Sequence, residues 1–124
     1  MRRILLIDDE DDIREVAALS LETVAGWEVL MASSGAEGIA RAKAEKPDAI
    51  LLDVMMPGMD GPTTFRELAK DAATCQIPVM LLTAKVQASD QKHFADLGVR
   101  AVLTKPFDPM GLAGEIARTL GWKS

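Results

Sequence analysis

The amino-acid sequence predicts a doubly wound α/β fold, in which a five-stranded parallel sheet carries helices on both faces. The first observation is that short apolar runs alternate with segments of helical periodicity along the 124 residues. The second is that most of these runs show no polar alternation, which is typical of strands buried on both faces. Strands that alternate with helices are joined as parallel strands by right-handed crossovers. A chain of this length fits one domain, so we expect a single domain over residues 1–124.

The strands are predicted from five apolar segments. The segment 28–32 is the weakest of them, and we expect it at the edge of the sheet, in the strand order 2-1-3-4-5. Pro47 breaks the chain just before the third segment, which then runs apolar without interruption. The expected strands cover residues 4–7, 28–32, 49–52, 78–82 and 101–103.

Capping and breaking residues predict where the helices begin and end. Ser34 and Glu37 have the spacing of a capping box, in which each side chain satisfies a free amide at the start of a helix. Glycine favours helix ends, and proline is tolerated in a first turn. The other boundaries are Gly26 after the first helix, Pro62 in the first turn of the third, Gly98 after the fourth, and Asp108-Pro109 at the start of the fifth.

Apolar residues recur at helical spacing between these boundaries, so each helix is predicted to bury one stripe against the sheet. In chain order the predicted stripes are Ile13, Val16, Ala17 and Val24; Ala36, Ile39 and Ala40; Phe65, Leu68, Ala69 and Ala72; Phe94 and Leu97; and Leu112, Ile116, Ala117 and Leu120.

Charge and cysteine content narrow the classes of function. The chain has 14 basic and 19 acidic residues, a net charge of −5, which argues against direct nucleic-acid binding because that requires clustered Lys and Arg. The lone Cys75 excludes an internal disulfide and suits a reducing cytoplasm. The apolar run after Arg3 is cut by acids at Asp8, so it is too short for a signal peptide. No apolar stretch approaches the ~20 residues of a membrane span.

The polar residues of interest come directly after the predicted strands. Asp8 and Asp9 follow the first strand, Asp53 the third, Thr83 the fourth and Lys105 the fifth. Ligands of such sheets bind at the carboxyl ends of the strands, near the point where the strand order reverses. Because the first and third strands are neighbours in the expected order, we expect Asp8, Asp9 and Asp53 to converge.

This set of residues indicates phosphoryl transfer onto a carboxylate. Three close carboxylates raise one another's pKa or recruit a cation, and oxygen ligands at an open site suit Mg²⁺. Lys105 and Thr83 can donate to phosphoryl oxygens, and the metal can neutralise charge during transfer. The sequence offers no histidine base, cysteine nucleophile or serine triad at these strand ends. A carboxylate nucleophile that forms an acyl phosphate is the chemistry that remains.

Four segments in the right order resemble the response-regulator receiver domain family. They read Ile-Leu-Leu-Ile-Asp-Asp-Glu at 4–10, Ile-Leu-Leu-Asp-Val-Met-Met-Pro-Gly-Met-Asp-Gly at 50–61, Pro-Val-Met-Leu-Leu-Thr-Ala at 78–84, and Leu-Thr-Lys-Pro-Phe at 103–107. The resemblance covers the whole chain. It implies a flavodoxin-like (βα)5 sandwich that works in a two-component phosphorelay as a signalling module, with no turnover of a separate substrate.

The resemblance also implies a role for each site residue. Asp53 is the phosphoacceptor, and Asp8 and Asp9 hold Mg²⁺ together with Asp53 and the Met55 carbonyl oxygen. Thr83 and Lys105 contact the phosphoryl group, helped by the backbone amides of Met55 and Ala84. The Lys105–Pro106 bond is expected to be cis. At the position of the family's switch aromatic this chain has Val102, which puts the family's usual coupling in question.

The expected partners are a sensor histidine kinase or phosphotransfer protein and a downstream protein, with no direct contact to nucleic acid or membrane. Met55 and Lys85 flank the site and lack the carboxylate or amide that would orient a water, so dephosphorylation is expected to be slow. His93 is expected on a solvated helix face.

Other interpretations stay open at this point. A degenerate receiver would act as a protein-interaction module without phosphorylation, and the set of Asp9, Asp53, Thr83 and Lys105 speaks against it. An aspartyl-phosphate hydrolase on the same fold would need a second Asp where this chain has Met55. A flavin-binding module would need a phosphate loop where this chain has consecutive acids.

Overall fold

The computed structural model describes residues 2–84 and 88–122 and confirms the predicted sheet. Five parallel strands lie in the order β2-β1-β3-β4-β5. The strands are β1 (Arg3–Ile7), β2 (Glu28–Ala32), β3 (Ala49–Asp53), β4 (Val79–Thr83) and β5 (Ala101–Thr104). The helices are α1 (Asp11–Ser20), the π-helical turn η1 (Leu21–Ala25), α2 (Gly35–Glu45), α3 (Gly61–Lys70), α4 (Ala88–Asp96) and α5 (Leu112–Leu120).

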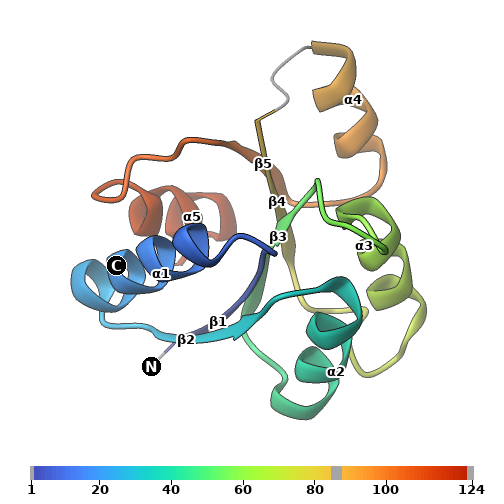
Figure 1. Cartoon of the computed structure of the whole chain (residues 1–124), viewed down its shortest axis with the longest axis horizontal. Helices are drawn as coiled ribbons and strands as arrows, with labels where there is room; N and C mark the ends of the chain where they lie inside the picture. Colours follow the sequence, from blue (N-terminus) through green and yellow to red (C-terminus); the bar gives the residue numbers. More distant parts are fainter. Residues whose placement is uncertain (1, 85–87, 123–124) are drawn as a thin grey trace.

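The helices cover both faces of the sheet, as Figure 1 shows: α1 and α5 lie on one side, and α2, α3 and α4 on the other. Because successive side chains of a strand point to opposite faces, β1 contributes Ile4 and Leu6 to one apolar cluster and Leu5 and Ile7 to the other. All the side chains of β3 and β4 are buried. These two central strands therefore hold the site residues at their ends on a rigid support.

The buried face of the first helix differs from the prediction. Val16 and Val24 are 45% and 44% exposed, whereas Ala17, Ala18 and Leu21 are buried against the sheet. The chain passes from α1 into the π-helical turn η1, where the wider turn changes the direction of the following side chains. Gly26, in the left-handed conformation, ends this segment as expected.

The stripe predicted for the second helix is confirmed only at Ile39, which is half-buried and packs against the apolar cluster. Ala36 and Ala40 are exposed, and the buried residues are Gly35, Gly38 and Ala42. A Cβ atom at Gly38 would lie 2.3 Å from Ile7 Cδ1, so α2 packs against β1 at a distance that only glycine permits. A pattern that counts apolar side chains cannot identify a face made of glycines.

The predicted capping box is half confirmed. The Ser34 hydroxyl accepts a hydrogen bond from the Glu37 amide at 3.1 Å, as the pattern predicts. The Glu37 carboxylate accepts from the amide of Ser33, one residue before the cap.

The third and fifth helices begin and end at other residues than expected. Helix α3 ends at Lys70, so Ala72 lies outside it, and Ala69 is exposed. Helix α5 begins at Leu112, because the Asp108 carboxylate accepts from the Met110 amide and holds a turn before the helix. The apolar stripe of α5 is confirmed from Leu112 onward.

Three side chains from separate parts of the chain form a stack beside α5. The rings of Trp27, before β2, and Trp122, after α5, meet edge to face with centroids 5.3 Å apart. The guanidinium of Arg2 lies 4.4 Å from the centre of the Trp122 ring. The stack joins the residues on either end of the described chain. Among the helices in the described residues, none has the length and apolar character needed to span a bilayer.

Candidate functional site

The ends of β1 and β3 bring the predicted carboxylates together. The two strands pair in parallel with Ile7 opposite Leu52. Asp8 and Asp53 are the next residues, so they lie side by side at the carboxyl ends of β1 and β3. Ligand oxygens of Asp8, Asp9, Asp53 and also Glu10 all lie within 4.8 Å of one another. Asp8 and Asp53 are buried, and Asp9 and Glu10 are exposed at the mouth of the site.

The end of β5 brings Lys105 to the same place. Thr104 pairs with Thr83 across the sheet, and the Lys105 amide donates to the Thr83 carbonyl oxygen at 2.9 Å. The Lys105–Pro106 peptide bond is cis. The ammonium nitrogen lies 3.0 Å from Asp8 Oδ2 and 3.1 Å from Asp53 Oδ1.

The electrostatics of the site are set by burial and by the close carboxylates. Burial and the neighbouring Asp8 carboxylate raise the pKa of Asp53 to about 6, against the opposing effects of Lys105 and the Met55 amide. Burial alone lowers the pKa of Lys105, but its contacts with Asp8 and Asp53 outweigh burial and hold this pKa above its ordinary value. Lys105 is therefore charged, and Asp53 is ionised at neutral pH.

Two buried carboxylate oxygens, Oδ2 of Asp53 and Oδ2 of Asp8, have no hydrogen-bond partner among the described residues. Asp53 itself is 2% exposed. A buried carboxylate oxygen in this state is unfavourable unless a cation or a covalent partner completes it. With the exposed carboxylate of Asp9 alongside, the donor set consists of hard oxygens at an open site, which fits Mg²⁺.

The remaining predicted residues lie on β4, on β5 and in the segments that follow β3 and β4. Thr83 is buried at the end of β4, and Ala84 follows it at an exposed bend. The side chain of Met55 is exposed beside the site. Val102 is half-buried on β5 and packs in the apolar cluster under α2, α3 and α4, which also contains the buried Phe94. Lys85 lies outside the described residues.

Sequence reasoning missed two residues that contact the site. Glu10 accepts a hydrogen bond from the Lys105 ammonium at 3.2 Å. Arg14 donates to the Asp8 carbonyl oxygen at 2.6 Å and forms an ion pair with Asp11, which fixes the loop after β1 to α1. The sequence shows only that Glu10 and Arg14 are charged. No spacing pattern predicts the direction of their side chains.

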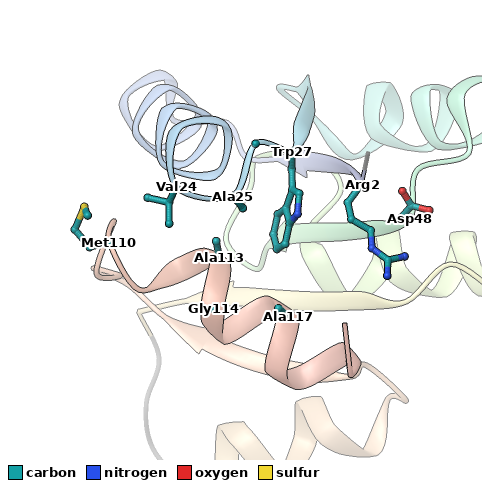
Figure 2. Close-up of a pocket in the computed structure, with 10 residues that line it drawn as sticks. Arg2, Val24, Ala25, Trp27, Asp48, Met110, Ala113, Gly114 and Ala117 are labelled. Atoms are coloured by element: carbon teal, nitrogen blue, oxygen red, sulfur yellow. The ribbon is translucent and has the colours of Figure 1, made fainter. Parts of the chain in front are cut away.

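A cavity of about 640 Å³ lies elsewhere, between η1, the start of β2 and α5. Figure 2 shows the Trp27 ring standing over it, with small residues of α5 such as Ala113 and Ala117 along one side and Arg2 and Asp48 at one end. None of the clustered carboxylates lines it. The chemistry expected from the sequence therefore belongs to the strand ends and not to this cavity.

Comparison with known proteins agrees with the fold. Residues 4–117 match the family of response regulator receiver domains. Protein PilH of Pseudomonas aeruginosa is 43% identical over 108 residues, which cover 87% of this chain and 88% of PilH. The DNA-binding dual master transcriptional regulator RpaA of Synechocystis sp. is 44% identical over 108 residues, but these cover only 44% of RpaA.

Solved structures give the same result. The chemotaxis response regulator CheY4 of Vibrio cholerae aligns with a TM-score of 0.89 at 29% identity, covering 96% of this chain and 98% of CheY4. A response regulator from Chloroflexus aurantiacus aligns with a TM-score of 0.88 at 32% identity, covering 97% and 98% of the two chains. The match over residues 4–117 and the sheet order shared with these structures show that the chain belongs to the response regulator receiver domain family of two-component signalling.

Proposed function

We propose that this chain, as one receiver domain over residues 1–124, accepts a phosphoryl group from a phosphohistidine onto Asp53 and changes its binding to a downstream protein. The observation that carries this proposal is the buried Asp53 Oδ2 atom, which has no hydrogen-bond partner among the described residues although a lysine and further carboxylates surround it. The donor is a sensor histidine kinase or a phosphotransfer protein, as the family implies.

In the transfer, an oxygen of Asp53 attacks the phosphorus of the phosphohistidine. The P–O bond forms as the P–N bond breaks, and the bonding electrons leave with the imidazole nitrogen, which then takes up a proton. Asp53 becomes an aspartyl phosphate. Lys105 compensates the added negative charge, and the Thr83 hydroxyl and the amides of Met55 and Ala84 donate to the phosphoryl oxygens.

Asp9, Asp53 and the Met55 carbonyl oxygen would hold Mg²⁺ at this site. When bound, the ion supplies positive charge that lowers the repulsion between the carboxylates and an anionic phosphoryl group. Asp8 completes the metal site through charge and orientation, because its Oδ1 atom accepts from the Glu10 amide at 2.9 Å and its Oδ2 atom faces Lys105.

The proposal is tested by phosphorylation with acetyl phosphate in Mg²⁺ buffer. The parent protein should gain a phosphoryl group that alkali or hydroxylamine removes, as expected of an acyl phosphate, and Asp53→Asn should not. Asp12→Asn is the matched control, because it removes one exposed carboxylate from the start of α1 without touching Lys105. A parent that takes up no phosphoryl group would favour the degenerate receiver, and an Asn variant labelled as fully as the parent would refute the assignment of Asp53.

The cellular setting is part of the same proposal. The exposed free Cys75 suits the reducing cytoplasm in which phosphohistidine donors work. A net charge of −5 favours a protein partner over nucleic acid.

A further inference from the structure

The ammonium of Lys105 is shared among three carboxylates. Its nitrogen lies 3.0 Å from Asp8 Oδ2, 3.1 Å from Asp53 Oδ1 and 3.2 Å from Glu10 Oε1. All three contacts are ion pairs, and the contact with Glu10 is also a hydrogen bond. Before Lys105 can turn fully to a phosphoryl oxygen on Asp53, one of these contacts has to open.

The three contacts are not equally easy to open. Asp8 and Asp53 have side-chain exposures of 0% and 3%, and separating a buried carboxylate from its cation is strongly destabilising. The Glu10 side chain is 59% exposed, so water can replace Lys105 there at little cost. The contact between Glu10 and Lys105 is therefore the one that opens first.

The position of Glu10 leaves its side chain available for this role. Its backbone amide is fixed by a hydrogen bond to Asp8 Oδ1 at 2.9 Å. Glu10 stands at the residue before α1, yet its side chain makes no capping hydrogen bond to that helix. It reaches instead from the loop after β1 to the end of β5, and so joins two segments that are 95 residues apart.

We propose that Glu10 is a positioning residue that holds the Lys105 ammonium at the mouth of the unphosphorylated site and releases it to the phosphoryl group. The inference rests on the proposed function of Asp53. Two consequences follow. Glu10 competes with the phosphoryl group for Lys105, so it favours the unphosphorylated state. The contact between Glu10 and Lys105 also exists in the unphosphorylated protein and is lost in the phosphorylated protein.

The experiment compares the parent protein with Glu10→Gln, which keeps the size of the side chain and removes its charge. Beryllofluoride, a stable analogue of an aspartyl phosphate, is titrated in Mg²⁺ buffer. The NMR signals of the Lys105 side chain are followed with and without it. We expect Glu10→Gln to bind beryllofluoride about two- to fivefold more tightly, the range typical of an exposed ion pair. The Lys105 signals should differ between parent and variant without beryllofluoride, and coincide with it.

Asp12→Asn serves as the control for charge alone, since Asp12 is an exposed acid of the same α1 start. Asp12→Asn should leave the Lys105 signals unchanged. It should not raise the affinity for beryllofluoride by the factor expected of Glu10→Gln. Equal Lys105 signals in parent and Glu10→Gln without beryllofluoride, or a difference that persists with it, would overturn the inference while leaving the role of Asp53 intact. A parent that fails to bind beryllofluoride would overturn the proposed function itself.

Discussion

Replacing Asp53 by asparagine should stabilise the metal-free protein against unfolding. The structure buries this carboxylate next to Asp8, and the pKa of Asp53 rises from an ordinary 3.8 to about 6 even though Lys105 is in contact. The folded protein therefore holds the ionised carboxylate less well than the unfolded chain does. Asparagine removes the charge, and Lys105 keeps Asp8 and Glu10 as partners.

The magnitude follows from the shift in pKa. One pKa unit corresponds to about 1.4 kcal/mol, so a shift of about two units sets an upper value near 3 kcal/mol, and we expect a gain of about 1–3 kcal/mol at pH 7.5. The sign changes with pH in a defined way. Because the folded pKa is the higher one, the parent loses stability as pH rises from about 4 to about 6, and the variant does not share this loss.

The assay is urea unfolding in EDTA, followed by circular dichroism at a series of pH values. The gain should be full above pH 7 and vanish below about pH 4. Added Mg²⁺ should narrow the difference, because it binds and stabilises the folded parent. An asparagine variant that is no more stable than the parent at pH 7.5, or a gain independent of pH, would refute the account of the site. Asp12→Asn should change stability by less than about 0.5 kcal/mol, as surface substitutions do.

Four further expectations can be checked separately. Asp9→Ala should weaken Mg²⁺ binding at least tenfold in a calorimetric or NMR titration, and unchanged affinity would show that Asp9 is not a ligand. Lys105→Ala should keep the fold but shrink the amide NMR shifts that phosphorylation causes in β5 and α5, so full-sized shifts would contradict its role. Gly38→Ala should lower the free energy of unfolding by about 1–3 kcal/mol, because its Cβ atom would overlap Ile7, and a stability within error of the parent would refute that packing. Met55→Asn should speed the loss of the phosphoryl group by offering an amide that orients water, which a decay measurement in Mg²⁺ buffer would show.

The sheet and the carboxylate cluster were predictable because each depends on local signals. Uninterrupted apolar runs identify buried parallel strands, and the residue after such a strand must lie at the sheet edge. Asp8, Asp53 and Lys105 meet for this reason. The helix faces were less predictable, because packing distance decides them. Gly38 is buried since α2 approaches Ile7 closely, which no hydrophobicity pattern contains.

Side-chain direction was the part that the sequence could not supply. In the sequence, Glu10 is one acidic residue among several. Only the fold shows that its side chain contacts Lys105 instead of capping α1. The exposure of Val24 has a similar origin, since the π-helical turn at η1 has no clear sequence signature.

The stack of Arg2, Trp122 and Trp27 bears on where the folding unit ends. The family match covers residues 4–117 and so ends within α5. The packing extends beyond residue 117. The ring centroids of Trp122 and Trp27 are 5.3 Å apart, and the Arg2 guanidinium lies 4.4 Å from the centroid of the Trp122 ring. The Trp122 amide donates to the Ala117 carbonyl oxygen at 2.8 Å. A shortened protein cut at residue 117, where the family match ends, would lose the last turn of α5 and expose one face of the Trp27 indole to water. The boundary drawn by packing therefore includes Trp122, and a truncated protein made for expression or crystallisation should retain it.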